Sequence, residues 1–363
     1  MHSEIGSFLW EYNSGISSSQ SLLWWEKDTY QRLFFESGRN AIKALCRILS
    51  STNKRVLLPV YTCHTVIKPF LDENWSIEFY EINTDLSINQ GDLENMSSLF
   101  KPSVVLVQSY FGFNTLQGMD RLLSILHKRG IVIVEDITQA LFSEQNIVHA
   151  DFYVASLRKF LAIPDGGVLV SHNPVDCVKV YPSDTRMVKT AIEAFDLKRE
   201  YINKNSTVTK EMYLTVYSKY TEILSRNDEL RCMSALASKI FEEKNVGDLI
   251  QKRKYNYECL FDSVHEVGFL KPVCALPKPG ETPLYFPVYV EGNRDSFRSY
   301  MTQNNIYCPI IWPKSDYIAN MKQSKYMYDK MLCFPIDQRY CIDDMQDVCR
   351  VIRRYKDEVI HNG

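Results

Sequence analysis

The chain has 363 residues, of which 45% are hydrophobic and 24% are charged. A chain of this length buries roughly three quarters of the surface that it exposes when unfolded, so a fibrous or disordered protein is excluded. The 42 basic and 44 acidic residues leave a formal net charge of −2, which provides no overall positive field to hold nucleic acid.

The ten cysteines stand singly in the sequence, with no C-x-x-C pair among them. In a long chain whose first residues lack the basic and apolar segments of a secretory signal, this spacing predicts reduced thiols. The longest apolar runs are strand-sized and fall short of the roughly 18 residues that a membrane span needs. We therefore expect a cytoplasmic protein that binds neither membranes nor nucleic acid.

An N-terminal arm (1–29) is followed by a region, 30–172, in which short β-rich runs alternate with amphipathic segments of helical length. Strands are expected over 56–61, 76–82, 103–111, 131–136, 151–156 and 166–171, and most are continuously apolar, as strands buried on both faces are. Helices are expected over 39–50, 65–74, 90–100 and 118–129. This alternation predicts a large α/β domain, a mostly parallel sheet with flanking helices.

The remaining two regions have different patterns. Residues 173–249 are charged and Tyr-rich and contain no clear strand, which predicts a helical insertion or bridge. Its Tyr213, Tyr217 and Tyr220 share one helical face, and ordinary packing is favoured over a substrate or subunit contact. The last region, 250–363, predicts a small C-terminal α+β domain, with helices over 250–265, 294–304 and 342–356 and strands over 285–290 and 307–312.

Lys159 lies in a turn at the carboxyl end of the strand 151–156. Although most lysines are solvated surface residues, this one is flanked by Phe160 and Leu161, and partial desolvation there lowers the pKa of the amine and makes it a better nucleophile. This is the environment that a Schiff-base lysine needs. Ser156, three residues earlier, can offer its hydroxyl to an anion such as phosphate if the turn is helical.

Asp136 follows four apolar residues and a glutamate, at the end of a central strand, where ligands of doubly wound sheets bind. A carboxylate there can hold a metal, orient a ribose, pair with a protonated ring nitrogen or simply cap a helix. No second carboxylate or histidine stands at metal-ligand spacing, so we predict no metal. Pairing with a pyridinium nitrogen is the role that fits a Schiff base at Lys159.

A small-residue turn at 37–42 precedes the first expected helix and contains Gly38 and Arg39. Helix amino termini attract phosphate through free N–H groups, and the arginine adds positive charge, although an ordinary helix cap explains the same residues. The chain contains no G-x-G-x-x-G loop, P-loop, G-x-S-x-G elbow or H-E-x-x-H helix. Their absence argues against standard nucleotide-binding, hydrolase and metalloenzyme sites.

Taken in order, six segments resemble the DegT/StrS-type sugar aminotransferase family, which consists of fold type I pyridoxal-phosphate enzymes. They are SGRNA (37–41), LLPVYTCHT (57–65), VEDITQA (134–140), ASLRKF (155–160), DGG (165–167) and IYCPIIWP (306–313). The resemblance is strong over 30–172 and weaker over 232–356. It implies a mostly parallel seven-stranded sheet and pyridoxal 5′-phosphate as cofactor.

The resemblance also implies roles for individual residues. The lysine matching Lys159 binds the cofactor covalently, and the aspartate matching Asp136 pairs with its ring nitrogen. The glutamine matching Gln139 bonds the ring oxygen, while Ser156 and the turn at Gly38 and Arg39 match the residues that hold the phosphate. Lys159 and Asp136 are thus the expected catalytic residues.

Two segments depart from the family pattern. Where the family usually places an aromatic ring over the cofactor, this sequence has Cys63. Either His64 or Tyr61 stacks on the cofactor ring instead, or that face of the ring is left uncovered. The family also has a Gly-x-Asn-x-Arg-Met stretch, whose Asn reaches the phosphate of a neighbouring subunit. The corresponding residues 230–234 keep only Met233.

The resemblance implies transfer of an amino group from an amino acid such as glutamate to a keto-sugar attached to a nucleotide. The pathway would make surface polysaccharide or a secondary metabolite, and the enzyme would be a homodimer. A dehydratase or decarboxylase that uses the same cofactor is an alternative, because the pocket decides which bond breaks. A non-catalytic binding protein is another, since fold does not fix function.

Overall fold

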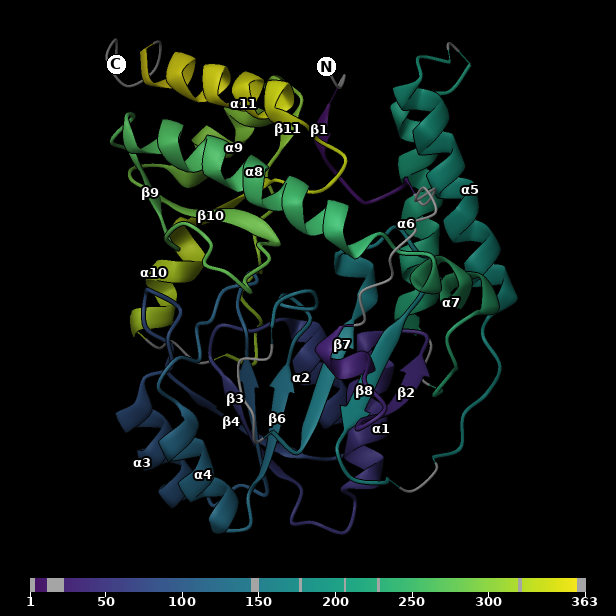
Figure 1. Cartoon of the computed structure of the whole chain (residues 1–363), viewed down its shortest axis with the longest axis vertical. Coiled ribbons are helices and arrows are strands. Elements are labelled where there is room, and N and C mark those ends of the chain that lie inside the picture. The colour runs from purple at the N-terminus through teal and green to yellow at the C-terminus, as the bar shows by residue number, and fades with distance from the viewer. Residues whose placement is uncertain are drawn as a thin grey trace.

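The computed structural model describes residues 4–11, 23–144, 150–175, 178–205, 207–226, 229–318 and 322–357. A seven-stranded sheet forms the lower half of the molecule in Figure 1, and a small α/β layer lies above it. The strands of the seven-stranded sheet are β2 (Gln31–Phe35), β3 (Arg55–Pro59), β4 (Ser76–Tyr80), β5 (Val104–Gln108), β6 (Val132–Asp136), β7 (Phe152–Ser156) and β8 (Gly167–Ser171). We call residues 31–171 the large-sheet region.

The strand order of the large sheet is β2-β8-β7-β6-β5-β3-β4. The five strands from β7 to β4 are parallel, and β8 runs antiparallel to both β7 and β2. The prediction of a mostly parallel seven-stranded sheet is therefore confirmed. β5 shows why such strands read as apolar runs, since all five of its residues are buried.

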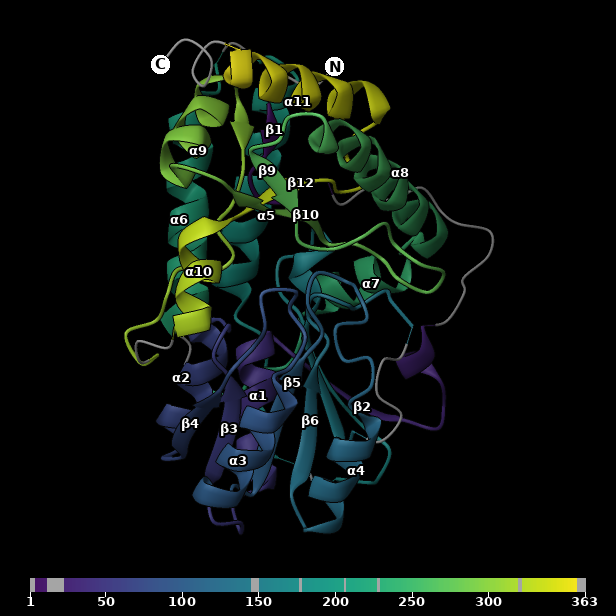
Figure 2. The ribbon, with the colours of Figure 1, turned by 90° about the vertical axis from the view of Figure 1, so that its left-hand side faces the viewer.

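Four helices flank this sheet, namely α1 (Gly38–Ile48), α2 (His64–Asp72), α3 (Gln90–Phe100) and α4 (Asp120–Lys128) (Figure 2). α1 packs on α2, and α3 packs on α4. Their amino termini agree with the predicted helices to within about two residues. The apolar face of each helix packs inward, as in α1, where Ala41, Ala44 and Leu45 have no exposed surface.

The residues after the large sheet form three helices, α5 (Thr185–Ile202), α6 (Lys210–Arg226) and α7 (Ala235–Glu242). α5 and α6 pack against each other along one side of the molecule (Figure 1). Of the tyrosines on α6, Tyr213 and Tyr220 are buried, while Tyr217 is half-buried and lines a cavity. The predicted packing is thus confirmed for all three tyrosines, since Tyr217 also packs against the α5–α6 contact and its ring is stacked on Phe8.

We call residues 246–355 the small-sheet region. It contains α8 (Val246–His265), α9 (Arg294–Gln303), α10 (Lys322–Lys330) and α11 (Ile342–Tyr355) around a three-stranded antiparallel sheet of order β12-β10-β9. The strands are β9 (Leu270–Pro272), β10 (Tyr285–Val290) and β12 (Met331–Pro335). β12 contains Cys333, one of nine free cysteines; the tenth, Cys177, lies outside the described residues.

The prediction of a strand over 307–312 is wrong for most of its length. Only β11 (Ile306–Tyr307) pairs, with β1 (Ile5–Gly6) of the N-terminal arm. Pro309 and Pro313 lack the N–H groups that a strand needs, so the ladder stops at the first two residues. A 3₁₀ turn, η1 (Trp24–Glu26), lies in the arm just before β2, and another, η2 (Leu157–Lys159), follows β7.

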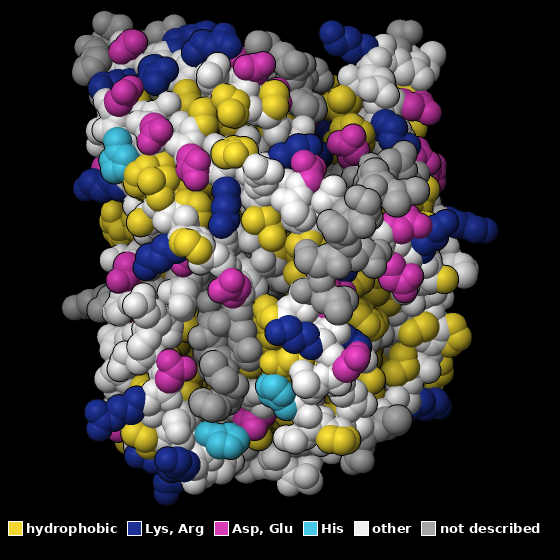
Figure 3. Space-filling view, viewed as in Figure 1, with side chains coloured by type: hydrophobic (Ala, Val, Ile, Leu, Met, Phe, Trp, Pro, Cys, Tyr) yellow, Lys and Arg dark blue, Asp and Glu magenta, His cyan; other side chains and the backbone are white. Residues whose placement is uncertain are grey.

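The described residues on the face of the molecule in Figure 3 form no large patch of a single charge. Lysine and arginine are interspersed with aspartate and glutamate over the face in Figure 3, consistent with the small net charge. Among the described residues, no helix is both long and apolar enough to span a bilayer. The same residues contain no group of three potential metal ligands.

Candidate active site

The carboxyl ends of the parallel strands bring the predicted residues together. Gln108 at the end of β5 is in register with Asp136 at the end of β6, and Asp136 pairs with Val154 of β7. A cavity of about 270 Å³ opens at this edge. Six of the eight predicted site residues line it, namely Gly38, Arg39, Cys63, Asp136, Ser156 and Lys159.

Lys159 is the last residue of η2, directly after β7. Its side chain is exposed to the empty cavity but lies deep in the molecule, where little bulk water surrounds it. Burial lowers the pKa of the amine below its ordinary value of 10.5, and the positive charge of Arg158 lowers it further, against the opposing effects of Cys63 and Asp136. The amine is therefore neutral, and nucleophilic, in a larger fraction of molecules than an ordinary lysine.

Asp136 is buried, and its Oδ1 accepts a hydrogen bond from the backbone N–H of Thr138 at 2.8 Å. Burial raises the pKa of this carboxyl, while the hydrogen bonds from Thr138 and the positive charge of Lys159 oppose that effect. Asp136 and Lys159 both line the cavity, and the charge of each acts on the pKa of the other. A ligand in this cavity can therefore contact both groups.

The neighbouring Glu135 has a different environment from Asp136. Successive strand residues point to opposite faces of the sheet, and the Oε1 of Glu135 accepts a hydrogen bond from the Ser109 hydroxyl at 2.5 Å. Burial raises the pKa of Glu135 to about 8, so this carboxyl is mostly protonated at neutral pH. Asp136 thus has no negative charge beside it that would oppose its own ionisation.

The amino terminus of α1 is clamped onto the ends of β7 and β8. The Ser37 hydroxyl caps the helix by accepting from the Asn40 N–H at 3.2 Å. A Cβ on Gly38 would lie 3.1 Å from the Cβ of Ser156, and a Cβ on Gly167 would lie 2.2 Å from the carbonyl carbon of Ser37. Glycine at both positions therefore lets the helix terminus approach the cavity, where its free N–H groups favour an anion.

Two arginines add positive charge to this end of the cavity. Arg39 donates hydrogen bonds to the carbonyls of Leu224 at 2.7 Å and Ser225 at 3.2 Å, in the last turn of α6. The guanidinium of Arg158 lies 5.1 Å from the ring centroid of Tyr220 on the same helix. The sequence predicted an anion-binding role for Arg39, and the structure adds that this side chain holds α6 against the site.

The predicted stacking residues occupy different surroundings. Cys63 lines the cavity, and its sulfur accepts a hydrogen bond from the Thr65 hydroxyl at 3.0 Å. His64 is exposed, with its Nδ1 3.3 Å from the Ser315 hydroxyl and its ring stacked on Tyr317. Tyr61 is buried and donates to the sulfur of Met331. Of these candidates, only Cys63 faces the cavity, and its role stays a prediction.

Gln139 does not line the cavity. It is buried, and its Oε1 accepts a hydrogen bond from the backbone N–H of Phe111 at 2.8 Å. Its role as a cofactor ligand stays a prediction. The stretch 230–234 contacts its own chain, because the Ser234 N–H and hydroxyl both donate to Asp165, at 3.0 and 2.8 Å.

Sequence reasoning missed several residues that line the cavity, among them Thr138, Trp312, Gln108 and Arg158. Thr138 donates to Asp136, and Trp312 comes from the loop after β11. Gln108 is 1% exposed, and its Nε2 has no hydrogen-bond partner among the described residues. The signal for Gln108 was available, because a polar residue ends an otherwise apolar strand at the edge where ligands bind. Trp312 had no such signal, since its place depends on long-range packing.

No protein-family model matches the chain, and no curated protein does. Solved structures do match. The aminotransferase PseC from Helicobacter pylori, involved in the biosynthesis of pseudoaminic acid, aligns with 90% of this chain and 87% of its own, at 15% identity and a TM-score of 0.65.

Two further structures match to the same extent. The putative sugar aminotransferase Spr1654 from Streptococcus pneumoniae, solved in its PMP form, aligns over 91% of this chain and 87% of its own, at 15% identity and a TM-score of 0.66. A DegT DnrJ EryC1 StrS aminotransferase from Brucella abortus aligns over 90% and 86%, at 14% identity and a TM-score of 0.62. The chain therefore has the fold of the DegT/StrS-type sugar aminotransferases, as its ordered motifs predicted.

Proposed function

We propose that the protein is a pyridoxal-phosphate-dependent aminotransferase that moves an amino group from an amino acid, such as glutamate, to a keto-sugar. The observation that carries the proposal is one cavity that contains a desolvated amine, Lys159, and a buried carboxylate, Asp136. The amino terminus of α1 and the side chains of Arg39 and Arg158 line the same cavity. This set of groups matches the amine, ring nitrogen and phosphate contacts that the cofactor requires.

The residues present fit this cofactor. The Nε2 of Gln108 is a buried donor without a partner in the described chain, and such donors are normally satisfied by a ligand or by water. Ser156 and the α1 terminus would hold the phosphate, Asp136 the ring nitrogen and Lys159 the aldehyde carbon. The cofactor, when bound, supplies the electron sink that stabilises negative charge at the substrate Cα.

The protein's own groups supply proton transfer and orientation. The Nζ of Lys159, with its lowered pKa, takes a proton from the substrate Cα as a general base and returns it as a general acid. Asp136 would pair with the ring nitrogen, and because Glu135 beside it is mostly protonated at neutral pH, that neighbour does not oppose the ionisation of Asp136. The walls of the cavity exclude bulk water, which strengthens each electrostatic contact inside.

The substrate and the assembly belong to the same proposal. The keto-sugar rests on the structural neighbours, of which one is an aminotransferase involved in pseudoaminic acid biosynthesis and one is a putative sugar aminotransferase. We also propose a nucleotide-linked acceptor in surface-polysaccharide or secondary-metabolite biosynthesis, a homodimer, and a cytoplasmic location, the last because nine cysteines are free thiols.

The proposal is tested with purified protein and pyridoxal phosphate. Wild-type protein should develop a visible absorbance band that borohydride bleaches, and Lys159→Ala should lose the band and all measurable transamination. Lys128→Ala, which removes an exposed lysine of α4, is the matched control and should behave as wild type. A band that persists in Lys159→Ala contradicts the proposal.

Glutamate alone separates transamination from the alternatives. Incubation of the cofactor-loaded protein with glutamate should convert the spectrum to that of the pyridoxamine form, because the first half of a transamination needs no acceptor. An unchanged spectrum together with a normal band favours a dehydratase or decarboxylase, and no band at all favours a non-catalytic binding protein.

A further inference from the structure

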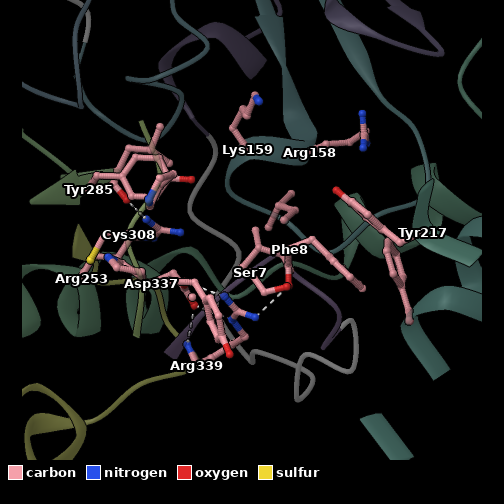
Figure 4. Close-up of a pocket in the computed structure, with 18 of the residues that line it drawn as sticks. Ser7, Phe8, Arg158, Lys159, Tyr217, Arg253, Tyr285, Cys308, Asp337 and Arg339 are labelled. Carbon is pink, nitrogen blue, oxygen red and sulfur yellow. Dashed lines mark hydrogen bonds and ion pairs between the residues drawn. The ribbon is translucent and has the colours of Figure 1, made fainter. Parts of the chain in front are cut away.

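A second cavity, of about 320 Å³, shares Arg158 and Lys159 with the first (Figure 4). Figure 4 shows these two residues along its upper edge and a cluster of polar side chains from the small-sheet region along its lower edge. Phe8 of the N-terminal arm and Tyr217 of α6 form another wall. The cavity therefore lies between parts of the chain that are distant in sequence.

Three arginines from the small-sheet region line this cavity, namely Arg253, Arg298 and Arg339. Asp337 is the single acidic residue in the described lining. Even without Arg158 and Lys159, the three guanidinium groups and one carboxylate leave two positive charges uncompensated. Charges removed from water are stable only when they are paired, so this excess points to a missing anion.

Asp337 forms its hydrogen bonds with Arg339, and its negative charge also acts on the nearby Arg253. The Nε of Arg339 donates to Oδ1 of Asp337 at 2.7 Å, and its Nη2 donates to Oδ2 at 2.9 Å. Its Nη1 donates to the Phe8 carbonyl at 2.9 Å. Both oxygens of the carboxylate thus belong to a bidentate pair, which is the strongest geometry for such contacts.

Arg253 is 1% exposed, and all its described hydrogen-bond partners are neutral. Its Nη1 donates to the Leu284 carbonyl at 2.9 Å, while Nε and Nη2 both donate to Oε1 of Gln338, at 3.1 and 2.8 Å. The guanidinium lies 4.6 Å from the ring centroid of Phe160, the residue after Lys159. A guanidinium is therefore buried close to the proposed catalytic lysine with no carboxylate bonded to it, and it shares the negative charge of Asp337 with the hydrogen-bonded Arg339.

Arg298 supplies the free donors. Its Nε donates to the Cys308 carbonyl at 3.0 Å, and no hydrogen bond or ion pair of its two terminal nitrogens is present among the described residues. The residue is exposed to the open space of the cavity. A planar guanidinium presented in this way suits a carboxylate or a phosphate, which it binds through two parallel hydrogen bonds.

We propose that this second cavity binds the carboxylate or phosphate group of a small substrate, held by Arg298 and balancing the buried charge of Arg253. The inference rests on the proposed function in one respect, because it assumes that the substrate bound in this cavity presents its reacting carbon to Lys159. A volume of about 320 Å³ lies at the lower end of the range for ligand pockets. It favours a compound of the size of a five-carbon dicarboxylate or a monosaccharide phosphate over a nucleotide-linked sugar in this cavity.

The test is a calorimetric titration of the full chain without cofactor. Glutarate stands for the dicarboxylate amino donor, glucose 6-phosphate for a phosphorylated acceptor, and glucose is the neutral comparison. Both anions should bind saturably and glucose should not, and the tighter anion shows which substrate the cavity serves. Arg298→Gln should weaken anion binding about 10- to 100-fold, which is the loss expected for a hydrogen-bonded charge pair.

Arg121→Gln is the matched control, because it removes an exposed arginine of α4 outside the lining of this cavity, and its affinities should equal those of wild type. A measurement that needs no variant is the salt dependence, since wild-type affinity should fall as ionic strength rises. Absence of anion binding, equal binding by Arg298→Gln, or equally tight binding of glucose overturns the inference. The absorbance band at Lys159 is measured separately, so a normal band without anion binding refutes this inference alone, and anion binding without a band refutes only the proposed function.

Discussion

The two cavities that meet at Lys159 are built from different kinds of structure. The first is lined mainly by residues at the carboxyl ends of β5, β6 and β7 and by the amino terminus of α1. The second is lined by the N-terminal arm, by helices α5, α6, α8 and α9, and by loops around the small sheet. One contact across it, from Arg339 to the Phe8 carbonyl, joins residues that are 331 positions apart.

Because of this difference, the sequence predicts the residues that line the first cavity much better than those that line the second. Parallel strands place their carboxyl ends at one edge of a sheet, so residues that follow apolar runs are brought together by the fold class alone. No such rule brings an N-terminal arm to an arginine near the carboxyl terminus. The first cavity is thus a consequence of local sequence, whereas the second depends on the packing of the whole chain.

The close packing of the first cavity is tested most strongly by Gly167→Ala. The added Cβ would lie 2.2 Å from the backbone carbon and oxygen of Ser37, and neither atom can rotate away as a flexible side chain does. Relief requires α1 to move off β8. We expect a loss of about 4 kcal/mol or more in the free energy of unfolding, measured by urea denaturation.

Gly91→Ala is the matched control for this substitution. Gly91 lies in the first turn of α3, and the nearest atom to an added Cβ is the Asn89 Oδ1, at 3.7 Å. Alanine is the better helix former, so this variant should be as stable as wild type or more stable by up to about 1 kcal/mol. Equal stability of the two variants would show that α1 does not rest on β8 as described.

Most of the large sheet was predictable because its strands are buried on both faces and are separated by recognisable helices. β2 was missed, since four of its five residues are only half-buried and its sequence, QRLFF, has no clear alternation. β12 was missed because α10 runs directly into it, from Lys330 to Met331, with no turn residue between them. The strand predicted over 307–312 failed at its prolines.

The residues of the two cavities also differ in how well the sequence predicted them. Asp136 and Ser156 end strands and Lys159 follows one, so local sequence was enough to predict that all three lie at the same edge of the sheet, and all three line the first cavity. The three arginines of the second cavity lie in α8, in α9 and in the loop between β12 and α11. In such places an arginine is usually a solvated surface residue. Their approach to Lys159 follows from contacts such as the hydrogen bond from Gln338 to the Phe160 carbonyl, at 2.8 Å, which no local pattern predicts.

A pH-dependent effect is expected beneath the first cavity, at Glu135. Its pKa is raised from 4.5 to about 8, chiefly by burial, so between these values the folded protein binds more protons than the unfolded chain. The stabilisation is complete below pH 4.5 and is lost as the pH rises through 8. Glu135→Gln, which is neutral at every pH, removes this dependence.

Relative to wild type, Glu135→Gln should therefore become more stable by about 3 kcal/mol as the pH rises from 5 to 8, an order-of-magnitude value from the raised pKa. Urea denaturation at the two pH values measures it. Ser109→Ala, which removes the hydroxyl donor but leaves the carboxyl, should retain the pH dependence. A difference between Glu135→Gln and wild type that does not change with pH would mean that the Glu135 carboxyl is ionised in the folded protein.

The smallest effect is expected at the arm that closes the second cavity. The rings of Phe8 and Tyr217 are stacked, with centroids 3.8 Å apart and an interplanar angle of 5°. A double-mutant cycle of Phe8→Leu and Tyr217→Leu, measured by urea denaturation, should give a coupling energy of about 1 kcal/mol. Phe8→Leu with Leu214→Ala, an exposed residue of the same helix, should give a coupling near zero. If both cycles gave no coupling, the arm would not be seated on α6 in solution, and the second cavity would be open on that side.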